Sequence, residues 1–250
     1  MANITPNNYI FASLFTGVFD VNRNELLKTN DFSVVEQWYS SVLKMKQKAI
    51  VFHNTFSEQI IKKYSNEHIR FVNVTYDGKL NPNIYRYFVY KQFLEQTKLR
   101  IDNLFITDIS DVEVIQNPFD KQLFLDNNDV LFCGDEPEIL DTIWMKNHCE
   151  HLRNSIADFS VFEEENKHKT LLNCGIVGGN ITVMEELLNH IVQLHEAYSY
   201  NNTTAYTLDM GVFNYVARTK FRDKIMHGAP INTAFKKYDA QNTNCWFRHK

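Results

Sequence analysis

An alternation of strand-like and helix-like segments over the first 110 residues is the feature that most restricts the fold. Short apolar, β-rich segments alternate there with segments that carry helical patterns. The expected strands are 9–15, 49–54, 69–76 and 104–109, and the expected helices are 33–48, 57–65 and 81–98. Strands that alternate with helices form parallel sheets, because each crossover helix returns the chain to the same end of the sheet. We therefore expect an α/β fold with a central, mostly parallel mixed sheet flanked by helices.

Two of these helices have recognisable start signals. Ser33 and Glu36 match a capping box, in which a hydroxyl and a carboxylate satisfy backbone N–H groups at the helix start. Pro82 fits the first turn of the helix over 81–98, where its missing N–H costs nothing. The apolar residues of the first helix fall on one face, and they are Val34, Val35, Trp38, Val42 and Met45.

The second half of the chain is less regular. Strands are expected at 129–136, 170–180 and 223–228, with glycines interrupting the second of them. Helices are expected at 137–155, 181–200 and 207–220, and an irregular tail follows to Lys250. Asn180 is the expected N-cap of the helix over 181–200. No repeat or low-complexity linker marks a boundary, so residues 1–250 are expected to form one domain.

Composition limits the functional classes. The 250 residues are 44% hydrophobic and 22% charged, and the net charge of −4 lacks the basic excess that nucleic-acid binding needs. The sequence has no run of 18 apolar residues and no basic segment ahead of an apolar one, so neither a membrane span nor a signal peptide is expected. Four widely spaced cysteines are expected to be buried free thiols. We therefore expect a soluble, cytoplasmic protein without a nucleic-acid partner.

The segment 104–119 carries the strongest chemical signal. Its apolar strand runs directly into Asp108 and Asp111, with Glu113 close behind. Carboxylates this close repel each other unless a cation lies between them, so the candidates are a metal ion, an arginine, or water on an exposed turn. Ligands of α/β sheets bind beyond the carboxyl ends of strands, and Mg²⁺ or Mn²⁺ typically takes one or two carboxylates plus substrate phosphates. The position of the two acids therefore favours a metal–diphosphate site over a solvated turn.

Two later segments carry weaker signals. Gly175, Gly178 and Gly179 would let a ligand approach the backbone closely, although a tight strand-to-helix turn explains them equally well. Asp209 opens a helix, where a carboxylate is favourable to the helix dipole without any catalytic role.

The chain ends in "CWFRHK", residues 245–250. Trp246 and Phe247 carry a large apolar area that favours burial, which would anchor the neighbouring charges against the protein. The alternative is a solvated basic end. Other histidines carry less information. His148, Cys149 and His151 do not share one helix face, so a zinc site is not expected, and His190 and His195 are expected at the surface.

In their order as well as their content, these segments resemble the GT-A glycosyltransferases. An acid pair at a strand end ("FITDISDV") is followed by "NCGIVGG", then by "LDMGVFNY", and a basic tail with a histidine closes the chain. The same order occurs in the α-1,3-galactosyltransferase and blood-group family, in glycogenin-like enzymes, and in small glycosyltransferases of bacteria and large algal viruses, which are the most similar. The usual acid motif is Asp-x-Asp, whereas here Ser110 stands in the slot of the second acid and Asp111 follows it.

The resemblance implies a single Rossmann-like GT-A domain. Residues 1–115 would form roughly its nucleotide-binding half, and residues 116–250 its acceptor-binding half and a closing tail. It also implies a metal-dependent enzyme that moves a sugar from a nucleotide-sugar donor, expected to be a UDP-sugar, to a hydroxyl of a glycan acceptor. The cofactor would be Mn²⁺ or Mg²⁺.

The resemblance further implies roles for individual residues. Phe11 and Ser13 would line the base and ribose, and Arg86 would reach the nucleotide or brace the acids. The residues implied to hold the metal are Asp108, which would also contact the donor, Asp111 and His249. The residues implied to contact the diphosphate or the sugar are Lys250, Asn173, Gly178 and Gly179. Asp209 would face the reacting sugar or the acceptor, as a base or as a stabiliser of positive charge.

Two alternatives stay open at this point. A nucleotidyltransferase that forms sugar nucleotides would share the fold and the metal, but it usually has a Gly-rich basic loop after its first strand. Residues 16–24 contain one glycine and one arginine, which argues against it. A non-catalytic relative that binds carbohydrate or nucleotide sugar is the second alternative.

Overall fold

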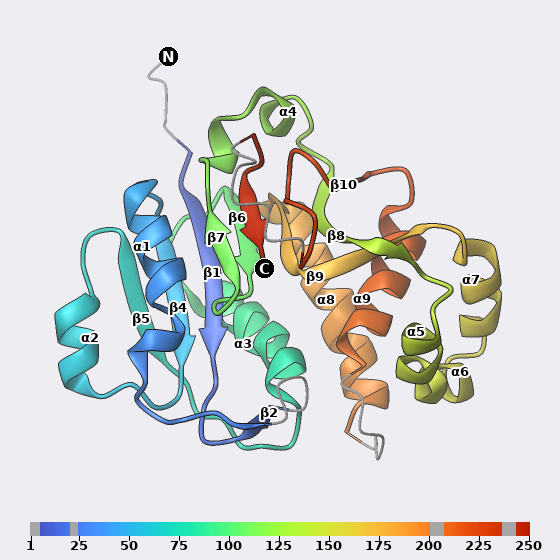
Figure 1. Cartoon of the computed structure of the whole chain (residues 1–250), viewed down its shortest axis with the longest axis horizontal. Coiled ribbons are helices and arrows are strands. Elements are labelled where there is room, and N and C mark those ends of the chain that lie inside the picture. The colour runs from blue at the N-terminus through green and yellow to red at the C-terminus, as the bar shows by residue number, and fades with distance from the viewer. Residues whose placement is uncertain (1–5, 21–24, 201–207, 237–243) are drawn as a thin grey trace.

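A computed structural model describes residues 6–20, 25–200, 208–236 and 244–250. Its centre is a seven-stranded sheet with the order β10-β8-β9-β6-β1-β4-β5 (Figure 1). These strands are β1 (Asn8–Leu14), β4 (Ala49–His53), β5 (Ile69–Asn73), β6 (Asn103–Thr107), β8 (Leu131–Ile139), β9 (Thr170–Asn180) and β10 (Ile225–His227). All neighbouring strands are parallel except β9, which is antiparallel to both β6 and β8. The expected mostly parallel mixed sheet is therefore confirmed.

Helices cover both faces of the sheet. They are α1 (Glu36–Lys44), α2 (Glu58–Tyr64), α3 (Pro82–Gln96), α4 (Gln122–Leu125), α5 (Ile143–His148), α6 (Glu150–Ser155), α7 (Phe159–Asn166), α8 (Ile181–Tyr198) and α9 (Asp209–Val216). Short 3₁₀ segments lie at η1 (Phe32–Val34) and η2 (Pro118–Asp120), and a π-helical segment, η3 (Ala217–Phe221), continues α9. Among the described residues, no helix is both long enough and apolar enough to cross a bilayer.

Alternate residues of the central strands pack in two separate hydrophobic cores, one on each face of the sheet. Ile10 and Ala12 of β1 pack in one core, together with Trp38 of α1. Phe11 of β1 packs in the other, together with Tyr87 of α3. This two-residue alternation is that of a strand buried on both faces. The four cysteines are buried free thiols, as expected.

The direction of the connections reverses between β1 and β6. The chain steps from β1 outward to β4 and β5, and then returns to place β6 on the other side of β1. In doubly wound sheets, the carboxyl ends of the two strands at such a reversal border a crevice that binds ligands. Asp108 follows β6 directly, so the acid pair lies at this switch point.

Two short antiparallel ladders were not anticipated. One joins β2 (Phe19–Asp20) to β3 (Glu25–Leu26). The other joins β7 (Val112–Val114) to β11 (Phe247–His249), so the end of the chain lies beside the acid pair in the middle of the molecule (Figure 1). Trp246 and Phe247 are buried, which confirms the prediction for the tail.

Three sequence-based expectations about elements were wrong. The segment 137–155 does not begin as a helix, because β8 continues to Ile139 through a register shift against β9 that accommodates Pro137. Ser33 and Glu36 do not form a capping box, since the Asp31 side chain accepts from Ser33 N (3.0 Å) and caps η1 instead. The glycines do not interrupt β9, which is continuous over Thr170–Asn180.

His195 is fully buried in α8, not at the surface as expected. Its Nδ1 lies 2.6 Å from Ser199 Oγ, and its ring stacks with Tyr87 at a centroid separation of 6.2 Å. Burial lowers its pKa to about 3. It is therefore neutral in the folded protein at any pH near neutral.

This histidine should make the protein less stable in mild acid. Well above pH 6.5, the His195 imidazole is unprotonated in both the folded and the unfolded chain. Below that value the unfolded chain takes up a proton that the folded state refuses, so the free energy of unfolding falls until the pH nears 3, by up to about 1.4 kcal/mol per pH unit. Denaturant unfolding at a series of pH values should show a shallower acid slope for His195→Gln. The partly exposed His190→Gln on the same helix serves as the matched control, and equal slopes for all three proteins would contradict this assignment.

Candidate functional site

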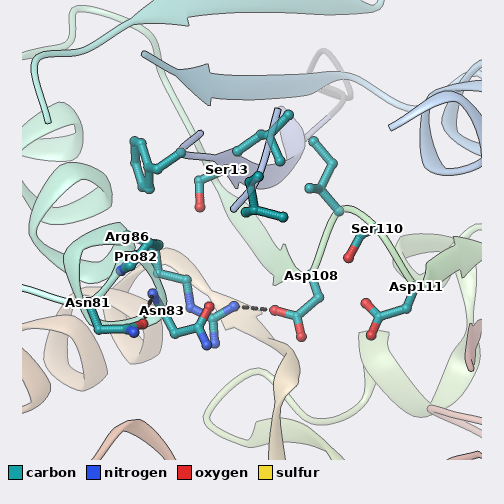
Figure 2. Close-up of a pocket in the computed structure, with 12 residues that line it drawn as sticks. Ser13, Asn81, Pro82, Asn83, Arg86, Asp108, Ser110 and Asp111 are labelled. Carbon is teal, nitrogen blue, oxygen red and sulfur yellow. Dashed lines mark hydrogen bonds and ion pairs between the residues drawn. The ribbon is translucent and has the colours of Figure 1, made fainter. Parts of the chain in front are cut away.

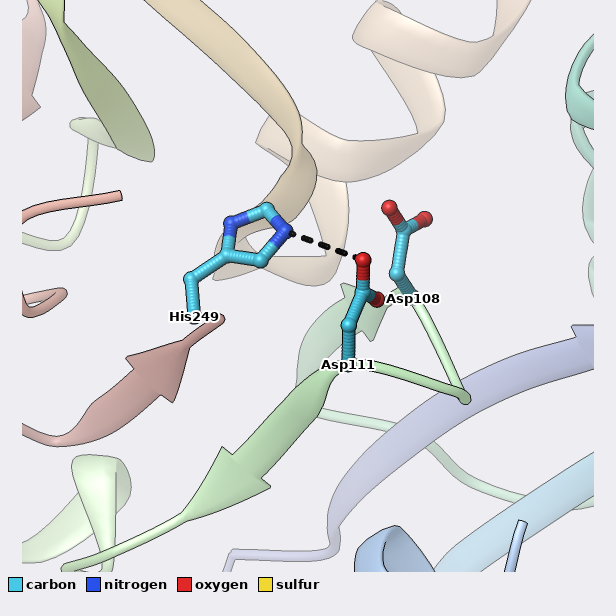
Figure 3. A group of neighbouring side chains, drawn as sticks. All are labelled: Asp108, Asp111 and His249. Carbon is cyan, nitrogen blue, oxygen red and sulfur yellow. Dashed lines mark ion pairs between the residues drawn. The ribbon is translucent and has the colours of Figure 1, made fainter. Parts of the chain in front are cut away.

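Three potential metal ligands converge beside the switch point. Ligand atoms of Asp108, Asp111 and His249 all lie within 4.8 Å of one another (Figure 3). The β7–β11 register explains how residues so distant in sequence meet, because it pairs His249 with Val112, the neighbour of Asp111. His249 Nε2 lies 3.9 Å from Asp111 Oδ2, and Lys250 N donates to Asp111 O at 3.0 Å.

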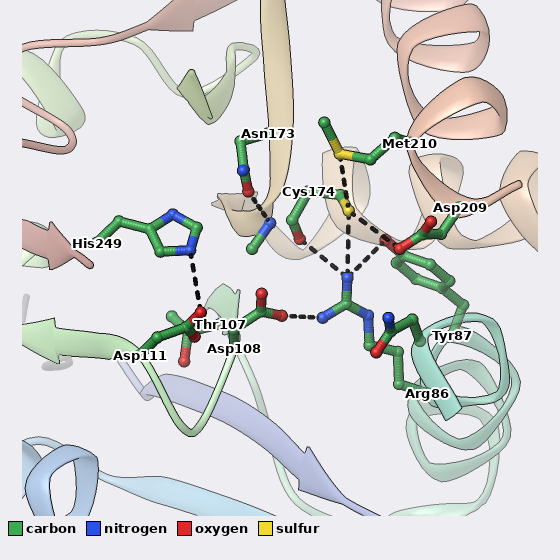
Figure 4. Close-up of polar contacts among 12 residues, drawn as sticks. Arg86, Tyr87, Thr107, Asp108, Asp111, Asn173, Cys174, Asp209, Met210 and His249 are labelled. Carbon is green, nitrogen blue, oxygen red and sulfur yellow. Dashed lines mark hydrogen bonds and ion pairs between the residues drawn. The ribbon is translucent and has the colours of Figure 1, made fainter. Parts of the chain in front are cut away.

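Arg86 supplies the positive charge that the acid pair needs. It is buried in α3, and its Nη1 donates to the Asp108 carboxylate. Its Nη2 contacts Cys174 O and Tyr87 Oη, each at 3.3 Å, so the guanidinium is held from several sides (Figure 4). Of the three candidates for relieving the repulsion, an arginine is therefore present at Asp108. Asp111 and His249 lie on the opposite side of Asp108 from this guanidinium.

His249 is in the protonation state that a metal ligand needs. Burial lowers its pKa to about 4, despite the opposing influence of Asp108, so the imidazole is neutral near pH 7. Its ring also packs against Phe235, with centroids 4.4 Å apart. Neutral imidazole together with two carboxylates is a donor set suited to Mn²⁺, and the carboxylates alone also suit Mg²⁺. The residues at this position therefore fit a divalent cation.

Gly175 makes this convergence possible. A Cβ at this position would lie 2.6 Å from Asp108 Oδ2, 2.6 Å from His249 Cε1 and 2.9 Å from Asn173 Oδ1. The backbone of β9 also fixes the start of the acid turn, because Asp108 N donates to Gly175 O at 2.8 Å. Only glycine leaves room here for three side chains to reach the same space.

Two adjoining cavities meet at the acid pair. The smaller, of about 150 Å³, lies between the end of β1 and the start of α3, and Ser13, Asn83 and Ser110 are among its lining residues (Figure 2). The larger, of about 750 Å³, extends over β8, β9, α5 and α9. The residues that line both cavities are Asn83, Arg86, Asp108 and Asp111. We call them the small and the large cavity.

Asp209 faces the large cavity from the first residue of α9, as predicted for a helix start. It is buried. Its Oδ1 lies 3.7 Å from His148 Nε2, and its Oδ2 accepts from Cys174 Sγ at 3.7 Å (Figure 4). Burial lowers the pKa of His148, although the Asp209 charge acts in the opposite direction. The Asp209 carboxylate therefore faces the cavity from a buried position between His148 and Cys174.

Asn173 connects β9 to a further carboxylate in the same cavity. Its Oδ1 accepts from Gly175 N at 2.7 Å, and its Nδ2 donates to Glu136 Oε1 at 2.9 Å. Burial raises the pKa of Glu136, an effect that the Asn173 hydrogen bond opposes. Asn173 thus lines the large cavity together with the acid pair and Glu136.

Four residues expected at the site are placed elsewhere. Phe11 has no exposed surface and packs against Phe52 and Tyr90 in the core, so it cannot reach a ligand. A Cβ at Gly178 would lie 2.2–2.4 Å from the Phe105 ring, and one at Gly179 would meet Val130 O at 3.0 Å. These two glycines therefore serve packing, and neither is among the residues that line the small or the large cavity. Lys250 is paired with Glu113 (Nζ–Oε1 2.8 Å) and is not among the residues lining either cavity.

Several residues of the large cavity were missed from the sequence, and three of them have side chains suited to ligand binding. They are Glu136, Trp144 and Lys236. Glu136 belongs to a "GDE" segment whose strand continues past the expected end, and Trp144 lies in a stretch that was expected to be ordinary helix. Lys236 has a positive φ of 58°, which lysine rarely adopts and which no sequence pattern indicates.

Comparison with known proteins does not identify a family. No model of a known protein family matches the sequence, and a search of curated proteins gives no significant match.

Two glycine substitutions should distinguish a glycine that serves the candidate site from one that serves core packing. At Gly175, an added methyl group meets the ends of side chains that can shift, and these are the groups of the site. At Gly178, it meets a Phe105 ring packed against Phe119 and Phe247, which have little room to move. Gly178→Ala should therefore cost about 1–3 kcal/mol of unfolding free energy. Gly175→Ala should cost less but weaken Mn²⁺ binding at least tenfold. Calorimetric titration and denaturant unfolding measure both, and the reverse pattern would contradict the assignment.

Proposed function

We propose that this protein is a metal-dependent glycosyltransferase of the GT-A type. It would transfer a sugar from a nucleotide-sugar donor, a UDP-sugar, to a hydroxyl of a glycan acceptor. The observation that carries the proposal is the convergence of two carboxylates and a neutral histidine at the junction of the small and large cavities. A metal–diphosphate at that junction would leave the nucleoside on one side and the sugar on the other.

The small cavity suits the nucleoside. It lies at the switch point of the sheet, where α/β folds bind nucleotides. Ser13 and Asn83 supply hydroxyl and amide groups that can bind ribose or base edges, and Pro82 starts the helix that carries Arg86. The position of the small cavity and its polar lining groups support the nucleoside assignment.

At the junction, Asp108, Asp111 and His249 would hold Mn²⁺ or Mg²⁺. When bound, the ion supplies positive charge that stabilises the diphosphate leaving group. Arg86 fixes the Asp108 carboxylate from the other side. Lys236 lines the large cavity nearby and replaces Lys250 as the lysine best placed to approach a phosphate.

In the large cavity, Asn173 and Asp209 would face the donor sugar. Glycosyl transfer passes through an oxocarbenium-like transition state, and a fixed carboxylate stabilises the positive charge that develops at the anomeric carbon. Asp209 is suited to this role because it is buried, with the Cys174 thiol as a hydrogen-bond donor to Oδ2 and the His148 ring 3.7 Å from Oδ1. The same carboxylate could instead accept a proton from the acceptor hydroxyl.

Metal dependence is the first test of this function. A panel of UDP- and GDP-sugars with Mn²⁺ should identify a donor that is consumed, and Asp108→Asn and Asp111→Asn should each lower its turnover by about 10²-fold or more. The exposed Asp126→Asn is the matched control and should retain full turnover. Release of nucleoside diphosphate indicates glycosyl transfer. Donor consumption that requires added pyrophosphate and yields nucleoside triphosphate and sugar 1-phosphate would indicate a nucleotidyltransferase. Full turnover in EDTA, or donor binding with no consumption, would contradict the proposal.

Asp209→Asn should separate catalysis from binding. The amide keeps the shape of the side chain but removes its charge, so kcat should fall by 10²-fold or more while the dissociation constant of the nucleoside diphosphate changes little. Single-turnover kinetics and calorimetry give the two quantities. If kcat is unchanged and only the unfolding free energy drops, by about 1 kcal/mol, Asp209 serves the helix terminus alone.

A further inference from the structure

We infer that β8 and α5 form the acceptor subsite, and that it takes an uncharged or amino-bearing pyranose rather than an anionic sugar. The inference rests on the proposed function and names its acceptor class. Three side chains of the large cavity carry it: Trp144, Glu136 and Glu138.

The exposure and packing of Trp144 suit an aromatic side chain that stacks against a ligand. It lines the large cavity, yet 45% of its surface is exposed, which is unusual for so large an apolar side chain. Its ring lies against the buried His148 ring, with centroids 4.7 Å apart and planes 31° apart. His148 in turn lies 3.7 Å from Asp209. The indole therefore packs against a residue that lies next to the proposed reaction centre, and it is among the side chains that line the cavity.

An exposed indole at a cavity rim suits a sugar ring. The aromatic face carries partial negative charge, and the C–H groups on one face of a pyranose carry partial positive charge, so the two surfaces attract as well as exclude water. The His148 side chain lies between Trp144 and Asp209. An acceptor stacked on Trp144 would therefore have a hydroxyl directed toward the donor sugar in the large cavity.

The acids of β8 determine the charge that the subsite accepts. Glu136 and Glu138 are two residues apart in one strand, and both line the large cavity. The strand runs beyond its partner β10, which pairs only as far as Cys133, and a register shift against β9 lies in this part. Such irregularities commonly redirect side chains at sites.

Carboxylates accept hydrogen bonds from sugar hydroxyls and attract an ammonium group, but they repel a second anion. Lys236 is the one lysine among the described lining residues, and the arginine there, Arg86, is engaged by Asp108. A uronate, sialylated or phosphorylated acceptor would therefore meet two carboxylates on β8, and Lys236, whose charge acts on Glu136, is the one lysine among the described lining residues to offset them.

The test compares matched acceptors with the donor identified above. Methyl β-galactopyranoside, methyl β-glucopyranoside and methyl β-glucosaminide are compared with the methyl glycosides of galacturonate and glucuronate, which keep a free carboxylate. Transfer to each acceptor is measured relative to hydrolysis of the same donor by water. In the wild-type protein, a neutral or amino glycoside should be used at least tenfold better than its uronate. Trp144→Ala should lower the ratio of transfer to hydrolysis about tenfold, and Trp144→Phe should restore most of it. Glu138→Lys should reduce the preference against the uronate.

Tyr200→Ala removes an exposed aromatic side chain that is not among the lining residues, and it should leave the ratio unchanged. Donor consumption with an unchanged ratio in Trp144→Ala, or equal use of uronates by the wild type, overturns this inference but leaves the proposed function intact. If the wild type consumes no donor, the proposed function fails. Saturation-transfer NMR then tests whether the same glycosides bind at the Trp144 subsite. Binding that is lost in Trp144→Ala supports it, and absence of binding to the wild type overturns it.

Discussion

The close approach of the Asp108 and Asp111 carboxylates is the constraint around which the site is built. Two like charges at the end of a buried strand are unfavourable unless positive charge compensates them. The fold supplies this charge with Arg86 at Asp108, and a neutral His249 lies beside Asp111 as a third potential metal ligand. A buried helix residue, a strand end and the end of the chain are thereby held together, and Gly175 leaves the space in which they meet. In the proposed function, a divalent cation would bind at this point.

The acid pair is also connected to the other polar groups that line the large cavity. β9 runs opposite to its neighbours and carries Asn173, Cys174 and Gly175 directly past the acid turn. Cys174 then contacts both Arg86 and Asp209, so the proposed metal site and the proposed reaction carboxylate share one buried network. His148 extends this network to Trp144 at the rim. Donor, reacting carbon and acceptor would therefore lie along a single path from the small cavity to β8 and α5.

The sequence predicts the parts of this structure that depend on local pattern. Strand and helix periodicity indicate the sheet, and an acid pair that follows a strand in such a sheet lies at a ligand-binding edge whatever the loop geometry. The burial of Trp246 follows from its apolar area. The β7–β11 ladder, in contrast, joins two three-residue strands more than 130 residues apart, and nothing local indicates it. Phe11 and Gly178 were misplaced for a related reason: a sequence does not reveal whether a strand residue faces a ligand or an aromatic ring of the core.

The most direct test of the account is pulsed EPR of Mn²⁺ bound to the protein in the presence of UDP. The convergence of Asp108, Asp111 and His249 predicts a nitrogen hyperfine coupling from a directly bound imidazole, together with phosphorus coupling from the diphosphate. The nitrogen coupling should disappear in His249→Ala and persist in His227→Ala, whose histidine pairs with Asp135 away from the acid turn. A Mn²⁺–UDP complex with no nitrogen coupling in the wild-type protein, or with the same coupling in His249→Ala, would contradict the account.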